Sequence, residues 1–502
     1  MMNEIENTLK RVVVVGKEPL CFVLRFVETD DKISAHFYDT VSLDLIRRIE
    51  ASKHVTSIGE ISQSVKYSDG KWELRFTDYV SKEYPNRVLL LQVSNLRTDG
   101  HIDIETGVEK YIPLELHQKW KHSQVKAGDI IIAITGTTIG IASMIPEGFP
   151  EANLNQALGH IVLKKAFELN KKPIEINKEY VLTYLNSKFG KTQVLRYGGF
   201  RAGQGGLSTG EVKSILIPLF DEPIQREIME QIYEHRTNAY SYGKRFFEKA
   251  EEITFLLENV LGEVMPRKSQ HIFLCYPQNF SDRIDCLYNS PDIIKLQAYL
   301  SKLEKEGKIQ LIRGEAIIAK DRSITKKIYE EREVEIFKYI DIDNVNKEVG
   351  SIEGFTEDFL LKLPTRARQI IKENDVLIPM PIGSTKGICI VPKEFEGQIC
   401  STGFIVIETK SFDEALLYFG ILKSNIVQKQ FYHFQSGSVQ PSISSTAFEE
   451  NVQIPVPKAA WREKYAEQVK IAVSELLRLK ADYSRELQKA KDTFEKLVFE
   501  NL

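Results

Sequence analysis

The sequence predicts an α/β (α+β) protein with two similar globular domains, separated by long helices that pair as an antiparallel coiled coil. Two observations lead to this prediction. Features of the first half of the chain recur in the same order in the second half. Each half also ends in a long charged segment whose apolar residues alternate at spacings of four and three. A repeat on this scale decides the architecture before any local motif does.

A chain of 502 residues can bury more than one core, since a domain takes roughly 100–200 residues. Its longest apolar runs, such as residues 12–15 and 130–134, are far shorter than the roughly 20 residues of a membrane span. The amino-terminal residues lack the apolar stretch of a signal peptide. We therefore expect a cytoplasmic protein that makes no membrane contact.

Composition also limits the chemistry of the chain. The five cysteines form no CxxC pair and have no histidine at zinc-ligand spacing, so we expect no metal site. The net charge of −3 is unfavourable for binding nucleic acid, which requires clustered Lys and Arg. Any basic face must therefore be local or shared with a partner.

Three strand-like stretches of the first half have echoes in the second. In the first pair each stretch precedes a helical segment, in the second an apolar strand closes on Asn, and in the third a polar turn with Asp leads into an apolar strand and a Gly, Ser and Thr loop. The pairs are residues 31–38 (DKISAHFY) and 282–288 (DRIDCLY), 88–96 (VLLLQVSNL) and 337–345 (FKYIDIDNV), and 126–140 (KAGDIIIAITGTTIG) and 372–387 (KENDVLIPMPIGSTKG).

The echoes continue to the end of each half. Each has a Pro-bearing turn before an apolar strand, a helical segment, a Gly, Ser and Gln-rich loop, and a strand ending in Ile-Pro, at Ile217 and Ile454. In the second copy Asn374 replaces Gly128 and two prolines follow, so the two loops need not share a conformation. We place the domains at residues 1–221 and 265–457 and the helices at 222–264 and 458–502. Residues 1–30 are a less typical start.

The two helices carry a seam of apolar residues. A repeat every 3.5 residues must be buried on another helix, and the simplest partner for each helix is the other one. The alternative is that both lie flat on the globular domains. The predicted seam is Ile228, Ile232, Ala239, Tyr242, Phe246, Ile253, Leu256 and Val260, interrupted by His235 and Lys249, and Val469, Val473, Leu476, Tyr483, Leu487, Ala490, Phe494 and Leu497, interrupted by Lys480.

A search for catalytic motifs gives a negative result. The sequence has no GxxxxGK loop and no GxGxxG after a strand. It has no Pro-Pro dipeptide, which excludes the Asn/Asp-Pro-Pro-aromatic tetrapeptide of amino-methyltransferases. Asp292 and Glu306 resemble part of a nuclease motif, but the helical segment between them would keep the two acids apart. We expect no catalytic residue in this chain.

The remaining chemistry is in loops whose side chains can hydrogen-bond or stack. Arg and Lys anchor phosphates or read guanine, and Gln pairs with adenine, although each cluster alone could be an ordinary solvated surface. The candidate DNA-binding residues are Lys66, Lys71, Lys121, Arg196, Tyr197, Arg201, Gln204, Arg366, Arg368, Lys386, Gln435, Ser438 and Gln440; Tyr67, Trp72, Lys119, Trp120, Ser384 and His433 lie beside them.

The ordered duplicate resembles the specificity (S) subunit of type I restriction–modification enzymes, over nearly the whole chain from about residue 31. The resemblance implies a non-catalytic reader of double-stranded DNA in a phage-defence complex, with each domain reading half of an interrupted target. The helices would set the gap and dock two modification (methyltransferase) subunits, which bind S-adenosylmethionine; a motor-nuclease restriction subunit would cut unmodified DNA. The helix positions expected to serve partner binding are Ile228, Ile232, Phe246, Val469, Leu476 and Leu487.

Two other interpretations remain open at this stage. The specificity subunit of a type IIB-like system would have nearly the same sequence features and would differ only in the enzyme it joins. A coiled-coil interaction module with no DNA role is the alternative from a different class. The sequence reveals neither the target bases nor the length of the gap.

Overall fold

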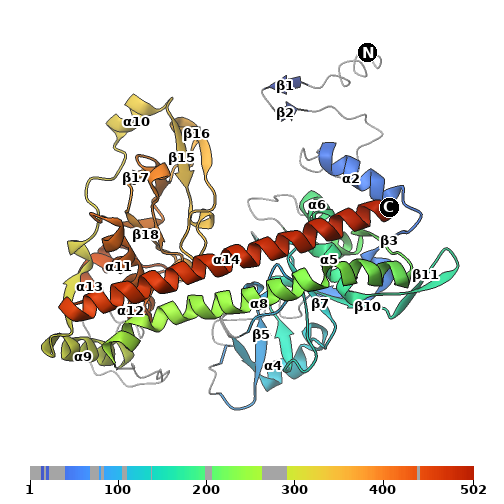
Figure 1. Ribbon diagram of the computed structural model, residues 1–502, viewed down its shortest axis with the longest axis horizontal. Coiled ribbons are helices and arrows are strands. Elements are labelled where there is room, and N and C mark those ends of the chain that lie inside the picture. The colour runs from blue at the N-terminus through green and yellow to red at the C-terminus, as the bar shows by residue number, and fades with distance from the viewer. Residues whose placement is uncertain are drawn as a thin grey trace. The chain divides into compact units, whose positions relative to one another are not determined.

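The structure is a computed structural model in which contacts divide the chain into two compact units. Unit 1 consists of Met1–Tyr242 and Asp482–Leu502, and unit 2 of Gly243–Ala481. Each unit thus contains part of both long helices, α8 (Glu222–Leu261) and α14 (Ala459–Asn501), drawn in green and red in Figure 1. The structure describes residues 13–15, 18–21, 40–67, 79–80, 84–104, 110–136, 138–197, 206–262, 291–437 and 441–502. The predicted echo between residues 31–38 and 282–288 lies outside these residues.

Unit 1 is built from short elements that precede α8. They are β1 (Val13–Val15), β2 (Glu18–Cys21), α2 (Thr40–Glu50), β3 (Val55–Ser57), α3 (Ile58–Ile61), β4 (Ser62–Tyr67), β5 (Arg87–Leu91), the 3₁₀ turn η4 (Val93–Asn95), β6 (Tyr111–Pro113), α4 (Leu114–Lys119), η5 (Lys121–Ser123), β7 (Ile130–Ala133), β8 (Ala142–Met144), β9 (Ala152–Leu154), β10 (Leu158–Leu163), β11 (Ala166–Leu169), β12 (Lys172–Glu175), α5 (Lys178–Asn186), α6 (Lys188–Tyr197), α7 (Thr209–Lys213) and β13 (Leu216–Pro218).

The main sheet of unit 1 has the antiparallel order β4-β10-β7-β8. Strand β7 is buried at every position because both of its faces are covered. Ile130 and Ile132 belong to one apolar core, while Ile131 and Ala133 belong to another. This explains the unbroken apolar run in the sequence, since a strand covered on one face only would alternate. A second sheet places β5 between antiparallel β6 and parallel β9.

Unit 2 has the same kind of composition. Its elements before α14 are α9 (Pro291–Lys305), β14 (Ile309–Arg313), η7 (Gly314–Ala316), α10 (Lys326–Arg332), β15 (Ile336–Ile340), η8 (Ile342–Asn344), β16 (Thr356–Phe359), η9 (Leu360–Lys362), β17 (Ala367–Ile370), β18 (Val376–Pro379), η10 (Ile382–Ser384), β19 (Cys389–Ile390), η11 (Lys393–Phe395), β20 (Ile399–Ser401), β21 (Phe404–Ile407), α11 (Phe412–Lys423), α12 (Asn425–His433), α13 (Ser445–Asn451) and β22 (Gln453–Pro457).

The strand pairing of unit 2 repeats that of unit 1. Strand β18 lies between β19 and β21, as β7 lies between β8 and β10. Strand β15 pairs with β16 antiparallel and with β20 parallel, as β5 does with β6 and β9. Both units therefore mix helices and sheets in one recurring topology, which confirms the predicted fold class and the internal repeat.

The strand that ends in Ile-Pro has the same support in both units. Strand β13 pairs with β3, and β22 with β14. A buried glutamine pairs with the backbone of each: the Leu216 N–H donates to Gln193 Oε1 at 2.7 Å, and the Gln453 N–H to Gln430 Oε1 at 2.7 Å. The amide groups of the two glutamines donate back to the carbonyls of Leu216 and Gln453 at 2.9 and 2.8 Å. Each strand that leads into a long helix is therefore locked in the same way.

The turn before β7 and β18 is also the same in both copies. Gly128 has φ +80° and Asn374 has φ +69°, so the asparagine adopts the left-handed conformation that glycine takes in the first copy. In each turn an aspartate accepts the N–H of the preceding lysine at 2.8 Å, Asp129 from Lys126 and Asp375 from Lys372. The loops after the strands do differ, as expected: Gly136 and Gly140 have positive φ in the first, whereas the second forms η10.

Both units pair a segment of α8 with a segment of α14. In unit 1 Ile228 and Ile232 share a core with Phe494 and Val498, and in unit 2 Lys249 Nζ lies 3.0 Å from Glu475 Oε2. The early part of α8 thus meets the late part of α14, and the late part of α8 meets the early part of α14. The helices therefore pair antiparallel, as predicted.

The buried seam differs in part from the predicted one. On α14 the buried residues include Ala472, Leu479 and Glu486, each one position before the predicted Val473, Lys480 and Leu487, which are half-buried. The polar interruptions on α8 have acidic partners: His235 Nδ1 lies 2.7 Å from Glu486 Oε2, and Lys249 contacts Glu475. A polar pair in a seam favours one register of the two helices. The seam position opposite His235 is therefore occupied by Glu486, and not by Leu487 as the periodicity predicted.

Candidate nucleic-acid interface

In unit 1 the candidate residues gather where β4 ends. Lys66 lies opposite His160 of β10, and its Nζ is 3.4 Å from Nδ1 of His122 in η5. The side chains of Lys66 and of Lys121 in the same turn are exposed. The structure thus brings together two clusters more than 50 residues apart, since Lys66 and His122 are separated by 56 positions.

The chain from Gly206 onward lies at this same edge of the sheet. The Leu207 N–H donates to the Ile134 carbonyl at 2.9 Å, just beyond β7, and Thr135 bridges to Gly206. The Tyr67 hydroxyl donates to the Leu207 carbonyl at 2.5 Å. The pKa of Tyr67 is raised mainly by burial and to a smaller extent by the negative charge of Glu211. The ends of β4 and β7 and the returning chain therefore meet at one place, which we call edge 1 (Lys66, Tyr67, Lys121, Thr135 and Gly206).

Arg196 and Tyr197 are the last two residues of α6. Both side chains are half-buried, and Tyr197 packs against the main core of unit 1. The candidates Lys71, Arg201 and Gln204 lie outside the described residues.

Unit 2 has an equivalent edge. The Ile443 N–H donates to the Met380 carbonyl at 2.9 Å, and Pro381 bridges to Ser442, so the loop after α12 returns to the end of β18. The Arg366 carbonyl accepts from the Thr402 N–H at 2.8 Å, in the turn that also contacts Met380. We call this place edge 2 (Arg366, Met380, Pro381, Thr402 and Ser442).

The charged candidates of unit 2 have distinct surroundings. The Arg366 side chain is 57% exposed and pairs with Asp341, so it is held in position while open to a ligand. Lys386 is exposed just after η10, and Gln435 is half-buried after α12. The Arg368 guanidinium lies 4.4 Å from the centre of the Tyr329 ring, and this contact suits a packing role better than DNA contact. Ser438 and Gln440 lie outside the described residues.

Two aromatic groups expected beside these clusters are buried. Trp120 is 2% exposed and packs in an apolar cluster with Val88, Leu90 and Ile112. His433 is 7% exposed at the end of α12. Neither can stack on a base without unpacking, and the expectation that they belong to the surface was wrong. Trp120 lies between two lysines in the sequence, and only the tertiary packing shows that its ring points inward.

Of the helix residues expected to bind partners, Ile228, Ile232, Phe246, Val469 and Leu476 are buried, and Leu487 is half-buried. Buried seam residues hold the helix segments in place and leave other positions to meet a partner. On α14 the large apolar side chains open to solvent are Ile471, 57% exposed, Leu477, 47% exposed, and Phe499, 45% exposed. The sequence signal for them is that they are apolar but off the seam.

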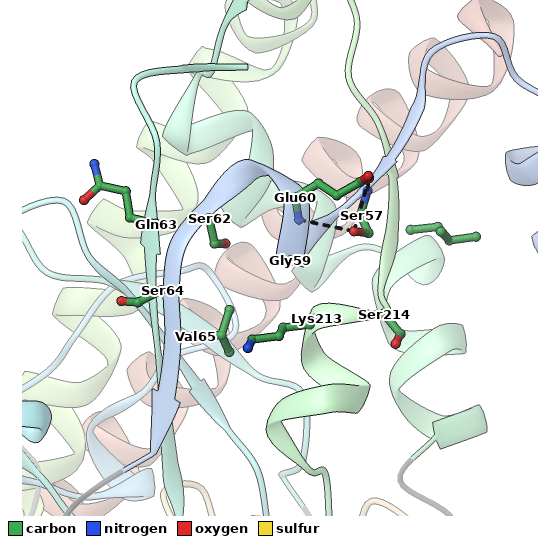
Figure 2. Close-up of a pocket in the computed structure, with 10 residues that line it drawn as sticks. Ser57, Gly59, Glu60, Ser62, Gln63, Ser64, Val65, Lys213 and Ser214 are labelled. Carbon is green, nitrogen blue, oxygen red and sulfur yellow. Dashed lines mark hydrogen bonds between the residues drawn. The ribbon is translucent and has the colours of Figure 1, made fainter. Parts of the chain in front are cut away.

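A hollow of about 570 Å³ lies beside β4 in unit 1, between α3 and α7 (Figure 2). Serine hydroxyls, the Gln63 amide and Lys213 line it. The Glu60 carboxylate accepts the Ser57 N–H at 3.1 Å and the Thr56 hydroxyl at 2.8 Å, and the Thr56 bond is the main cause that lowers its pKa. This hollow can offer hydrogen bonds, and its carboxylate is already engaged.

The described part of the chain contains no group of three His, Cys, Asp or Glu side chains placed to hold a metal ion. Among the same residues, no helix combines the length and apolar character needed to cross a membrane.

No protein-family profile and no curated protein matches the chain. Among solved structures, the chain is similar to a type I restriction–modification S subunit from M. genitalium at 14% identity and TM-score 0.34, over 88% of this chain and 95% of that one. It is similar to the HsdS subunit from Thermoanaerobacter tengcongensis at 13% identity and TM-score 0.30, over 89% and 97%. The type IIG restriction endonuclease BpuSI gives 8% identity and TM-score 0.30, over 39% of this chain and 28% of that one. Values this low say nothing about what the present chain binds.

Proposed function

We propose that this chain is the DNA sequence-recognition subunit of a type I restriction–modification complex, and that its two units each read one half of an interrupted target. The observation that carries the proposal is the duplication itself. The two units share the pairing around their central strands, the locking glutamines and the aspartate turn. Their edges present different side chains, Lys66 and Lys121 in one and Arg366 in the other. A common frame with different edges is what two independent readers require.

The chemistry of the edges suits duplex DNA. Lysine and arginine anchor phosphates, and arginine also reads guanine with two hydrogen bonds. The exposed fraction of Arg366 leaves its guanidinium accessible, while its pairing with Asp341 limits its freedom. Since the chain as a whole carries a net charge of −3, part of the electrostatic attraction to DNA would come from partner subunits.

The long helices would set the gap between the half-sites and dock two modification subunits. Ile471, Leu477 and Phe499 are exposed apolar side chains of α14 that partner subunits could cover. Methylation would be carried out by these partners with S-adenosylmethionine, and cleavage by a separate restriction subunit. In this proposal the chain contributes recognition and spacing only.

The proposal is tested by methylome sequencing of the host with and without the gene, followed by binding assays on the assembled complex. We expect a two-part target whose methylation disappears with the gene. Lys66→Ala should alter recognition in one half and Arg366→Ala in the other. A lost phosphate contact lowers the salt slope by about one, whereas a lost base contact relaxes one position by roughly 1–3 kcal/mol.

Lys172→Ala is the matched control for Lys66, because Lys172 lies on β12, is 74% exposed and is not part of edge 1. An uninterrupted methylated sequence would refute the two-reader proposal. A complex that binds DNA equally well without this chain would favour the non-DNA interaction module, and assembly with a different enzyme would favour the type IIB-like alternative.

A further inference from the structure

Each unit has a turn that reaches from the reading domain to a long helix. In unit 1 it is residues 97–103, closed by pairing of Leu96 with Ile102, which we call turn A. In unit 2 it is residues 346–353, closed by pairing of Val345 with Ile352, which we call turn B. Both follow the 3₁₀ turn after the equivalent strands, β5 in one unit and β15 in the other. The two turns are therefore equivalent features of the repeat.

Turn A is held firmly to its own domain. The Met144 N–H donates to the Gly100 carbonyl at 3.0 Å, and the Ser143 hydroxyl donates to the His101 carbonyl at 2.8 Å. Gly100 has φ +92°, and a Cβ there would lie 2.9 Å from Leu182. The turn is thus a fixed projection of the domain rather than a loose loop.

The outer side of turn A contacts both long helices. The His101 ring stacks on the Tyr240 ring of α8, with centroids 4.0 Å apart and planes inclined by 23°. The Thr98 hydroxyl lies 3.3 Å from the Tyr483 hydroxyl of α14. The Asp99 side chain is 7% exposed, and its charge acts on Lys491 and Tyr483.

Turn B contacts α14 through different residues. Lys480 of α14 forms an ion pair with Glu353, and its Nζ donates to the Ser351 hydroxyl at 3.3 Å. On the domain side, the buried Lys423 of α11 donates to the Lys347 and Glu348 carbonyls at 2.9 and 2.7 Å. Gly350 has φ +72°, and a Cβ there would lie 2.1 Å from the Ile388 carbonyl. The geometry has been kept in both copies although the side chains differ.

Each turn lies some distance from the principal contact between the domain and α14. In unit 1 that contact includes Phe494, which shares the domain core, and Tyr483 lies 11 residues earlier, about 16 Å along a helix at ~1.5 Å per residue. In unit 2 Gly420 of α11 packs against Tyr465, and Lys480 lies 15 residues later, about 22 Å. A body held at two separated points cannot rock about either of them.

We propose that turns A and B are the second attachment of each reading domain to the helices, and that their helix contacts, Tyr240, Tyr483 and Lys480, are positioning residues that determine how strictly the protein measures the gap in its target. This inference rests on the proposed function. One added base pair moves a half-site by about 3.4 Å and rotates it by about 35°. A domain that can rock tolerates this change, whereas a domain held at two points rejects it.

The test uses the assembled complex and three duplexes, carrying the determined target with its natural gap and with the gap one base pair longer or shorter. The measured quantity is the ratio of methylation rates, natural gap over altered gap. In Tyr240→Ala and Lys480→Met we expect this ratio to fall roughly fivefold, the factor given by a lost contact of ~1 kcal/mol. The rate on the natural gap should change little, because neither residue belongs to edge 1 or edge 2.

Matched controls separate positioning from general damage. Tyr240→Phe keeps the ring and should restore the ratio. Tyr233→Ala removes a more exposed tyrosine, 70% against 44%, from the same helix, and Lys470→Met removes an exposed lysine from α14; both should leave the ratio unchanged. A ratio unchanged in Tyr240→Ala and Lys480→Met, or a ratio lowered equally by the controls, would overturn the inference.

A measurement without DNA distinguishes this inference from the proposed function. Hydrogen exchange of the free chain should show faster exchange at residues 97–103 in Tyr240→Ala and at residues 346–353 in Lys480→Met, with the locked strands β13 and β22 unaffected. If the wild-type complex methylates no two-part target, the proposed function fails whatever this exchange shows. If the target has two parts but the turns exchange as in wild type, the second attachment itself is wrong.

Discussion

Replacing Gln430 with Met tests how firmly the globular part of unit 2 is joined to α14. Gln430 is 2% exposed, and its amide exchanges two hydrogen bonds with the backbone of Gln453, at 2.7 and 2.8 Å. Methionine has nearly the same volume, so the substitution removes the hydrogen bonds without leaving a large cavity. Gln453 is the first residue of strand β22, which leads into α14. The change therefore acts on the junction between domain and helix.

The expected magnitude follows from the two lost bonds. Each contributes about 0.5–1.5 kcal/mol net, and somewhat more is lost because the backbone groups remain partly buried without a partner. We expect about 2 kcal/mol in total, which corresponds to roughly thirtyfold faster exchange where local opening is rate-determining. Gln193→Met should have the same effect on β13, because its bonds to Leu216 are 2.7 and 2.9 Å long.

Hydrogen exchange of the full chain, read by mass spectrometry, resolves the two junctions separately. Gln430→Met should accelerate exchange at residues 453–457 and leave residues 216–218 as in wild type, and Gln193→Met should give the reverse. Gln231→Met, an exposed change on α8, is the control and should alter neither strand. Unchanged exchange at β22 in Gln430→Met, or equal acceleration of both strands by either variant, would refute the reasoning.

Three further outcomes are expected. Asn374→Ala should lower the free energy of unfolding by about 1–2 kcal/mol because of its positive φ, while Asn374→Gly should not, as urea midpoints would show. Phe494→Ala should cost about 3–5 kcal/mol because this side chain is fully buried, and Leu487→Ala, at a half-buried position, should cost clearly less; equal losses would contradict the observed seam. Burial lowers the pKa of Lys423 to about 7, so the folded chain releases a proton that the unfolded chain keeps up to pH 10.5. Stability should then rise with pH between these values, and Lys423→Met should abolish that rise.

Sequence patterns were sufficient for the repeat because its features are local and appear twice. The apolar run at β7, the aspartate turn and the Ile-Pro strand each have a physical signature that does not depend on distant residues. The seam of α14 was predicted only in part. At positions 472/473, 479/480 and 486/487 either of two neighbouring residues could occupy the seam. Which one is buried depends on the side chains of the facing helix, and the sequence of α14 alone does not show it. Lys480 leaves the seam to contact turn B, and Glu486 enters it to meet His235.

The candidate interface was predictable to a similar extent. The sequence identified polar clusters but not which of them meet, because the meeting of Lys66 with η5 depends on strand pairing between β4 and β10. It also could not separate exposed from buried members. Trp120 and Arg366 both lie among polar neighbours in the sequence, yet one packs inside and the other is open to solvent.

The two units share a backbone frame and differ in the charged side chains that contact it. The carboxylates of Asp129 and Asp375 hold the same turn, but the first contacts His160 Nε2 at 2.7 Å and the second contacts Arg322 Nη2 at 3.2 Å. The frame has kept its backbone contacts while its charged partners changed. Turns A and B also occupy equivalent places but have different partners. Tyr240 and Tyr483 contact turn A, whereas Lys480 and Lys423 contact turn B. If the gap is measured by the frame and the bases are read at the edges, substitutions at edges 1 and 2 should alter the bases of one half-site at a constant gap, whereas substitutions in the turns should alter the tolerance of the gap at constant bases.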